Sequence, residues 1–539
     1  MIQSYFVSYW GHNHLITFVV ASAFVAAALL MNRHYSIERL HAASQFNSRT
    51  AAHRLSQFII ILAAGHWLFY LLVPSFVDYG EPVMPLLAGN IPQGAPVYAD
   101  WGSGEEIVGS NYGPYVFLAQ IPIVLWLHSI AASKLVGIIF AAGSCVLVYL
   151  TLRKIIDSKE EKFGEPAILL ALMIGFLASE LHYWFWNRPD SALILTVACG
   201  IFIHERASFR KSLLAIGLLA GIATNLKLFG AIYFVPLGVA CLTRNATALR
   251  KLWPAIAGAA LLFAVAVALP FTLPSFNARA YVENIFMMPN QGFIIGSMVE
   301  SLFFGAGILL LPFLLWLRSD RDIENTVLLL ALTGCAAVTA VISGKPGGGP
   351  PYMLPFAPLS VFAAARMKPR PELNSSLNAA SIRNIVLVSV LACAAPIWAY
   401  SWYQMAKPFT RLAEDRAKKA ELLTLFQAYP EAEVGPSSGI QAEEDIYARV
   451  HRAFLGHTIK FDYVNYADQR LAGVPSETML PLLSDCRVPY WIFSRSGDKF
   501  ASQIDGKPIF RHHEVERFHA NYVLSKKLKY YELWKCIER

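Results

Sequence analysis

Two carboxylates follow directly on the end of a long apolar segment. The sequence reads LLVPSFVDYGEPVMPLL, so Asp78 and Glu81 come just after the apolar segment 56–76. The loop that follows, 77–130, contains no Lys or Arg. A carboxylate without a cation in its own loop can remove a proton from a hydroxyl group. Carboxylates at a helix end can also be simply solvated, and both interpretations remain open here.

A second pair of charges lies in a short loop with the sequence YWFWNRPDSALILT. Arg188 can bind a phosphate through its planar guanidinium, and Asp190 can orient a sugar or an acceptor. Trp184 and Trp186 come just before the pair. The alternative is an aromatic belt in which an Arg–Asp pair closes a turn. Ionisable side chains at a membrane boundary are costly to bury, so a buried pair would need a purpose.

Lys227 (TNLKLFG) and Lys345 (SGKPGGGPPYMLP) are isolated cations in two further short loops. Either one can be explained by a long side chain that extends from a helix end to the interface. The glycines at 347–349 would also let backbone amides approach an anion closely. The spacing is not that of a P-loop, which argues against nucleotide binding.

The composition predicts that these residues are carried by a membrane protein. The chain has 539 residues, of which 55% are hydrophobic and 15% are charged, with a mean hydropathy of +0.44. Soluble proteins have about 25% charged residues. The net charge of +8 does not arise from basic patches with interleaved aromatics, so we expect no nucleic-acid partner.

The predicted fold class is a polytopic α-helical membrane protein with about twelve transmembrane helices and a small α/β or α+β domain at the C-terminus. A segment of about 20 apolar residues spans a bilayer. The predicted spans are 14–31, 56–76, 131–152, 165–184, 190–206, 211–226, 228–243, 252–272, 297–317, 325–343, 352–366 and 384–402.

The basic residues predict the orientation of these spans. Most of them fall in one alternate set of loops, whereas the other set holds only Arg188, Lys227, Arg279 and Lys345, with Lys134 at a helix mouth. The positive-inside rule places the first set in the cytoplasm. Both termini would then face outward. The apolar stretch 112–127 would invert every later loop if it spanned the membrane, so we expect an interfacial helix there.

Three regions follow from this pattern: an additional helix and loop at 1–55, a catalytic membrane domain at 56–402 with the outward loop 77–130, and a soluble domain at 403–539. Cys486 and Cys536 are the two cysteines of the polar tail, and the sequence leaves their pairing open. No metal-ligand spacing of cysteines is present.

The motifs, taken in order, resemble those of the GT-C membrane glycosyltransferases, which include the protein O-mannosyltransferases (glycosyltransferase family 39) and the lipid A aminoarabinose transferases. The resemblance rests on DYGE at 78–81, IPQGAPVYAD at 91–100 and NYGPYVFLAQ at 111–120, followed by NRPD at 187–190, Lys227 and KPGGGPPY at 345–352. Tyr112-Gly113-Pro114 departs from the Tyr-Pro-Pro-like element of the family at one position. The segment 14–31 is a further departure.

The resemblance implies transfer of a sugar from a polyprenyl-phosphate donor to a lipid, glycan or protein acceptor, with inversion at the anomeric carbon. Carried over by motif, Asp78 is the general-base candidate and Glu81 its helper or a sugar contact. The implied substrate-binding residues are Arg188, Asp190, Lys227, Lys345, Tyr352, Tyr98 and Tyr112. Many members work without a metal and others use a divalent cation, so no cofactor is assigned. The implied location is a bacterial inner membrane with a periplasmic C-terminal domain.

Other functions remain open at this stage. A transporter or flippase of lipid-linked glycans would place ionisable residues near the midplane of paired repeats, whereas these acids lie at the ends of the spans. A polysaccharide polymerase or ligase would use a lipid-diphosphate-linked glycan. A simple membrane anchor would not need a dozen helices.

Overall fold

The structure, a computed structural model, is mostly helical. It describes residues 41–100, 106–156, 164–244, 249–320, 322–367, 379–437, 441–474, 479–504 and 507–537. The predicted span 14–31 lies outside the described residues.

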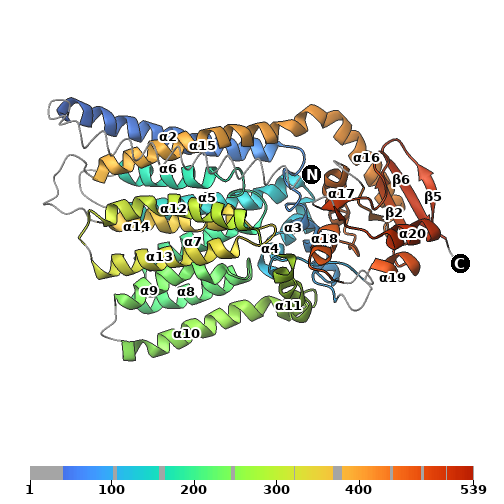
Figure 1. The fold of residues 1–539 in the computed structure, drawn as a ribbon, viewed down its shortest axis with the longest axis horizontal. Helices are drawn as coiled ribbons and strands as arrows, with labels where there is room; N and C mark the ends of the chain where they lie inside the picture. The colour runs from blue at the N-terminus through green and yellow to red at the C-terminus, as the bar shows by residue number, and fades with distance from the viewer. Residues whose placement is uncertain are drawn as a thin grey trace.

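A bundle of long helices makes up the larger part of the molecule (Figure 1). Its helices lie side by side, and the sheet lies beyond one end of the bundle (Figure 1). The bundle helices are α2 (His41–Leu72), α5 (Ile130–Ile155), α6 (Gly164–Ala178), α7 (Pro189–Arg206), α8 (Phe209–Thr224), α9 (Val235–Thr243), α10 (Leu249–Ala268), α12 (Ile295–Trp316), α13 (Ile323–Ile342), α14 (Phe356–Arg366) and α15 (Ala379–Ala406).

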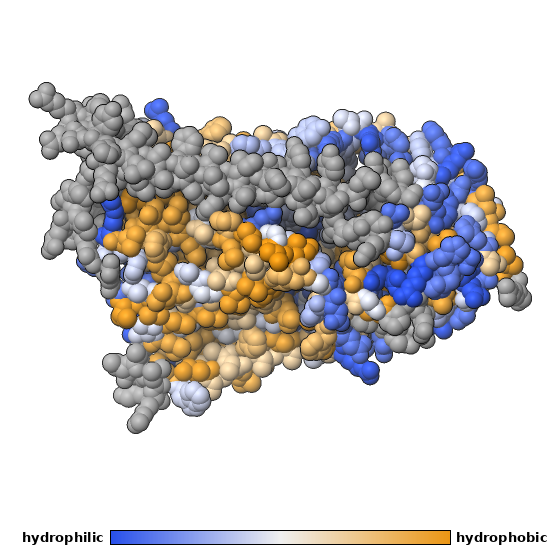
Figure 2. Space-filling model, in the orientation of Figure 1, coloured by the Kyte–Doolittle hydropathy of each residue, from blue (hydrophilic) through white to orange (hydrophobic). Residues whose placement is uncertain are grey.

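Six helical stretches in the described part of the chain are long and apolar enough to cross a membrane. They are Thr50–Leu72, Ile130–Ile155, Leu252–Thr272, Ile295–Trp316, Ile323–Ile342 and Ile382–Ala428. The visible surface of the bundle is largely hydrophobic, whereas the surface over the sheet end is largely hydrophilic (Figure 2). Such a difference is expected when one part of a molecule lies in lipid and the other in water.

The far end of the bundle is held together by an ion-pair cluster. Arg366, in the last turn of α14, donates to Glu205 of α7 at 2.9 Å and to Glu324 of α13 at 2.6 Å. Arg153 and Lys154 end α5 on the same side of the bundle, because α5 and α7 both begin near the sheet end and run away from it. Arg366, Arg153 and Lys154 therefore lie at the end of the bundle that is opposite the sheet.

The predicted interfacial segment 112–127 and the loop 273–296 each form short pieces rather than one long helix. The stretch 112–127 contains α4 (Pro114–Leu118) and η3 (Ile123–Leu127), which ends where His128 has φ 44°. The stretch 273–296 contains α11 (Ala278–Phe286) and η7 (Met288–Gln291). Prolines interrupt both stretches and prevent a continuous helix. The first loop also contains α3 (Val83–Ala88) and η1 (Ile91–Gln93). Three further 3₁₀ turns adjoin the ends of bundle helices: η4 (Gly230–Phe234), η6 (Leu269–Thr272) and η8 (Pro350–Met353).

The C-terminal part is built on a four-stranded sheet with the order β1-β2-β6-β5. β1 pairs with β2 in parallel, and the other two pairings are antiparallel. The elements are η9 (Lys407–Arg411), α16 (Leu412–Ala428), β1 (Glu433–Val434), α17 (Gln441–Phe454), α18 (Tyr463–Leu471), α19 (Met479–Ser484), β2 (Tyr490–Ser494), β3 (Gln503–Ile504), β4 (Lys507–Pro508), α20 (His512–Asn521), β5 (Tyr522–Lys527) and β6 (Tyr531–Cys536).

A disulfide joins Cys486 to Cys536, with 5.8 Å between the two Cα atoms. It fastens the end of β6 to the turn before β2. The pairing that the sequence left open is therefore present in the structure.

Backbone hydrogen bonds attach the C-terminal part to the first loop. The Ile107 N–H donates to Lys460 O at 2.7 Å, and the Asp462 N–H donates to Ile107 O at 2.6 Å. Asn90 accepts from the Ile459 N–H through its side-chain oxygen at 3.0 Å. The loop that carries Asp78 is thus held between the bundle and the C-terminal part.

Candidate active site

Asp78 lies in the turn that joins α2 to α3. Its Oδ1 accepts from the Gly80 N–H at 2.7 Å and from Arg188 Nη1 at 3.3 Å. A Cβ at Gly80 would lie 3.0 Å from Asp78 Oδ1 and 3.3 Å from Arg188 Nη1. A side chain at position 80 would therefore disturb this ion pair, which explains why glycine suits the DYGE motif.

Burial has a clear effect on Asp78. It raises the pKa of the Asp78 carboxyl above its ordinary value, and the nearby Arg188 guanidinium opposes that rise. A carboxylate with a raised pKa is a stronger base than one in water. The environment therefore suits proton abstraction from a hydroxyl group.

Glu81, the second predicted carboxylate, is completely buried and does not line the cavity described below. Its Oε2 accepts from the backbone N–H groups of Val77 at 2.7 Å and Asp78 at 3.1 Å. Its Oε1 accepts from the Tyr70 hydroxyl and from the Asn187 N–H at 3.4 Å. Glu81 therefore connects the turn of Asp78 to the loop of Arg188.

A chain of alternating charges runs from Arg188 into the bundle. Arg188 Nε lies 3.9 Å from Asp190 Oδ2, and Lys227 Nζ lies 2.6 Å from Asp190 Oδ1. Lys227 also lies over the ring of Tyr352, 4.3 Å from the centroid. Asp190 is in the first turn of α7, where the helix dipole favours a negative charge. It is buried and holds two cations that line the cavity, although it does not line the cavity itself.

The two tyrosines of the first loop support Arg188. Arg188 Nη2 donates to the Tyr112 hydroxyl at 2.6 Å, and the Tyr98 hydroxyl donates to Tyr112 O at 2.6 Å. A Cβ at Gly113 would come within 2.1 Å of Asn225 O, so the loop backbone can pack against the end of α8 only with glycine there. Neither tyrosine lines the cavity.

Lys345 lies in the loop before η8, with its Nζ 3.4 Å from Met288 Sδ. It does not line the cavity, but the adjacent Gly347, Gly348 and Gly349 do. Its charge acts on Asp468 of α18, a residue that the sequence reasoning missed. Burial raises the pKa of Asp468 to about 6, and Lys345 opposes that rise. Asp468 accepts from Asn111 Nδ2 at 2.8 Å, so the C-terminal part contacts the NYGP motif directly.

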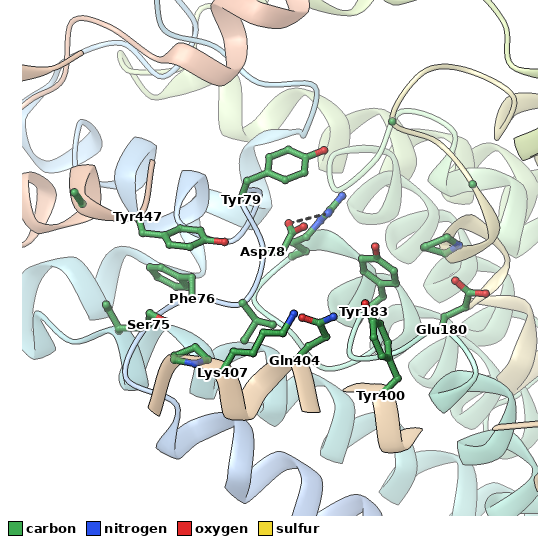
Figure 3. Close-up of a pocket in the computed structure, with 18 of the residues that line it drawn as sticks. Ser75, Phe76, Asp78, Tyr79, Glu180, Tyr183, Tyr400, Gln404, Lys407 and Tyr447 are labelled. Carbon is green, nitrogen blue, oxygen red and sulfur yellow. Dashed lines mark hydrogen bonds and ion pairs between the residues drawn. The ribbon is translucent and has the colours of Figure 1, made fainter. Parts of the chain in front are cut away.

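Among the predicted site residues, Asp78, Arg188, Lys227 and Tyr352 line a cavity of about 1490 Å³ between the bundle and the C-terminal part. Figure 3 shows Asp78, Glu180 and Tyr183 on one side and Gln404 and Lys407 on another. We define the bundle wall by its ionisable residues Asp78, Glu180, Arg188, Lys227 and Glu300. We define the α16 wall by Lys407, Arg411, Asp415, Arg416, Lys418 and Lys419.

The sequence reasoning did not identify the α16 wall or Glu180, Tyr183 and Gln404. One signal was available in the sequence, because Lys407, Arg411 and Asp415 recur every four residues directly after an apolar span. Residues with that spacing share one face of a helix. Within the described residues, no group of three or more His, Cys, Asp or Glu could hold a metal ion.

The chain resembles known glycosyltransferases in sequence and in fold. The sequence profile of glycosyltransferase family 87 matches residues 112–347. The crystal structure of ArnT from Cupriavidus metallidurans in the apo state has a similar fold, with a TM-score of 0.50 and 15% sequence identity. That similarity covers 90% of this chain and 98% of the ArnT chain. Both findings support a GT-C membrane glycosyltransferase. No curated protein sequence matches this chain.

The family match does not include the carboxylate of the first loop. The matched region contains Arg188, Asp190, Lys227 and Lys345, whereas Asp78 precedes it. The fold places Arg188 Nη1 3.3 Å from Asp78 Oδ1, so the matched region and the first loop meet at the cavity.

Proposed function

We propose that this glycosyltransferase moves a sugar from a polyprenyl-phosphate carrier to a hydroxyl group of a lipid, glycan or protein. The reaction would take place on the membrane face that carries the C-terminal domain, at the periplasmic side of a bacterial inner membrane. The observation that carries the proposal is the contact of Asp78 with Arg188 at a cavity that Lys227 also lines. One wall thus offers both a base for the acceptor and cations for a phosphate.

Asp78 is the proposed general base. Its Oδ1 is engaged by Gly80 and Arg188, so Oδ2 is the oxygen that takes the acceptor proton. The acceptor oxygen then forms a bond to the anomeric carbon of the sugar while the bond from that carbon to the phosphate oxygen breaks. A single displacement of this kind inverts the anomeric configuration.

Arg188 and Lys227 are the proposed partners of the departing phosphate, which receives the electron pair of the broken bond. A lipid phosphate leaves as an anion, so it needs positive charge rather than a proton. Asp190 keeps both cations in place through its contacts of 3.9 and 2.6 Å. Tyr352 supports Lys227, and Tyr98 and Tyr112 support Arg188, so these residues act by positioning.

A lipid-linked donor fits the surroundings of the cavity. Residues of the cavity come from α12 and α15, which belong to stretches that are apolar and long enough to span a bilayer. A polyprenyl chain could therefore stay in the hydrocarbon region while its phosphate enters between these helices.

The test is transfer by the purified full-length chain in proteoliposomes that contain total membrane lipids as the acceptor source. Radiolabelled polyprenyl-phosphate sugars are supplied, and the matching nucleotide sugars are supplied in parallel. We expect label to move only from the lipid-linked donors. Equal transfer from nucleotide sugars would contradict the proposed donor class. Parallel reactions with EDTA test whether a divalent cation is needed.

A further inference from the structure

A lysine is buried near the start of α5, within one of the stretches that can span a membrane. Lys134 exposes none of its surface, and it does not line the cavity. A lysine near the end of a span usually extends to the interface and keeps its ammonium group in water, which Lys134 does not do. A buried cation in such a segment is costly and indicates a function. The proposed chemistry gives Lys134 none.

Lys134 binds the end of α2. Its Nζ donates to Tyr70 O at 3.1 Å and to Val73 O at 2.9 Å. The last carbonyls of a helix lack partners within the helix and carry a partial negative charge, which a cation neutralises. Asp78 follows Val73 closely in the chain. Lys134 therefore fixes the place from which the chain leaves α2 and enters the turn of Asp78.

A second partner explains why the group that binds α2 is charged. A glycine can satisfy the carbonyls at a helix end without any charge. The charge of Lys134 acts on Glu81. Burial raises the pKa of the Glu81 carboxyl above its ordinary value, and Lys134 is the strongest influence that opposes this rise. Glu81 also faces the Tyr70 hydroxyl from α2 and the backbone of Asp78 in its own turn.

The hydrogen bonds of Glu81 require its negative charge. Its partners among the described residues all donate: they are the backbone N–H groups of Val77, Asp78 and Asn187 and the hydroxyl of Tyr70. An ionised carboxylate only accepts, whereas a protonated carboxyl has an O–H that must donate. Protonation of Glu81 would place its own hydrogen against one of these donors. The link between the turn of Asp78 and the loop of Arg188 therefore depends on an ionised Glu81.

The start of α5 also contacts the loop of Arg188 directly. Asn187, the residue before Arg188, donates from Nδ2 to Ser133 Oγ at 2.6 Å. A Cβ at Gly137 would come within 2.3 Å of Trp186 O, so α5 packs closely against the backbone of this loop. The helix that carries Lys134 thus touches both the end of α2 and the loop of the phosphate-binding candidate.

We infer that Lys134 is a positioning residue for the transfer reaction: it fixes the end of α2 and supplies the charge that holds Glu81 between the turn of Asp78 and the loop of Arg188. This inference rests on the proposed function and adds a residue that touches no substrate. Lys134 acts through Glu81, so its removal should affect the rate and its pH dependence more than the binding of the donor.

The first experiment measures the ionisation of Glu81 without any substrate. Infrared spectra of the purified full-length chain are recorded against pH, because a protonated carboxyl has a C=O stretching band that a carboxylate lacks. The Glu81 part of that band is the part missing from E81Q, or from E81Q/K134M when K134M is measured. We expect the band in K134M to appear at least about 1 pH unit higher than in the wild type, since a nearby opposite charge lowers a carboxyl pKa by about 1–3 units. K154M removes a lysine from the other end of α5 and should titrate like the wild type.

The second experiment measures transfer from the polyprenyl-phosphate donor against pH. In K134M, kcat should fall by about tenfold through misplacement of the reacting groups, with KM for the donor within about twofold of the wild type. K134R keeps the charge and should recover most of the loss. The acidic limb should move to higher pH in K134M, because Glu81 then loses its charge at higher pH. It should return to the wild-type position in E81Q/K134M, where no carboxyl titrates at position 81. K134Q keeps an N–H donor without a charge and replaces K134M if that variant does not fold.

Three results would overturn the inference: an unchanged titration of Glu81 in K134M, an acidic limb that stays shifted in E81Q/K134M, or equal losses of rate in folded K134M and K134R. In each of these cases the wild type still transfers sugar, so the proposed function survives. If the wild type moves no sugar from any polyprenyl-phosphate donor, the proposed function fails instead. The infrared titration then decides by itself whether Lys134 keeps Glu81 ionised.

Discussion

The bundle wall and the α16 wall face the same cavity but hold their charges in different ways. On the bundle wall both cations have carboxylate partners: Arg188 contacts Asp78, and Lys227 contacts the buried Asp190. On the α16 wall, Lys407 and Lys419 are exposed and belong to no ion pair within the described residues. Buried, paired charges are fixed in position, whereas exposed charges keep their side-chain freedom.

Because of this difference, we expect catalysis on the bundle wall. Rate acceleration requires groups that are already oriented when charge develops. The bundle wall meets that requirement, because buried partners such as Glu81 hold its loops together.

The largest effect is expected from Asp78→Asn. Loss of the base should reduce transfer by about 10³-fold, within the range of general-base catalysis, because the amide cannot take the acceptor proton. Initial rates with the polyprenyl-phosphate donor measure the effect. Asp100→Asn, an exposed acid of the same loop, is the matched control and should keep wild-type rates. Transfer by Asp78→Asn at wild-type rate would remove Asp78 from the base role.

Arg188→Gln should reduce transfer by about 10²-fold, since one stabilising charge is lost from the leaving phosphate. It should also shift the pH profile. A base works only when ionised, so activity falls as the pH drops through the pKa of Asp78. Burial raises that pKa and Arg188 opposes the rise, so its removal should move the acidic limb to higher pH.

Arg279→Gln is the control for that profile, because Arg279 is an exposed cation paired with Glu283 at 2.9 Å and does not line the cavity. It should leave the rate and the acidic limb unchanged. If the acidic limb stays in place in Arg188→Gln, the group that titrates in the rate profile is not Asp78.

Glu81→Gln should reduce transfer by about tenfold, less than Asp78→Asn, because Glu81 acts by holding backbone groups rather than by touching substrate. Breaking hydrogen bonds of a buried carboxylate costs about 1–3 kcal/mol, so the unfolding temperature should fall together with the rate. The acidic limb of the pH profile should remain. A loss as large as that of Asp78→Asn, without a change in unfolding temperature, would instead indicate a catalytic Glu81.

The smallest effect on transfer is expected from C486S/C536S. The disulfide closes a sequence separation of 50 residues, and its loss should destabilise the C-terminal part by about 2–4 kcal/mol. Differential scanning calorimetry with and without reductant measures this. The transfer rate at low temperature should change less than twofold, because the bundle wall does not depend on this link. Cys199→Ser, a free cysteine of α7, is the control.

Much of the helical framework followed from the sequence alone. The apolar segments predicted at 131–152, 190–206 and 325–343 correspond to α5, α7 and α13 within a few residues. Hydropathy is a local property, so a single chain suffices to locate such helices. The loop motifs also placed Asp78, Arg188 and Lys227 among the candidates, because ionisable residues are scarce at the ends of apolar segments.

Which of these candidates line the cavity depends on the tertiary structure. Asp78 and Glu81 are three residues apart and look equivalent in the sequence, yet one lines the cavity and the other bonds Asn187, 106 positions away. The same applies to Tyr98, which supports Tyr112 instead of lining the cavity, and to the cations that follow α15. The direction of a loop side chain is set by hydrogen bonds to distant segments, and a local sequence pattern does not contain that information.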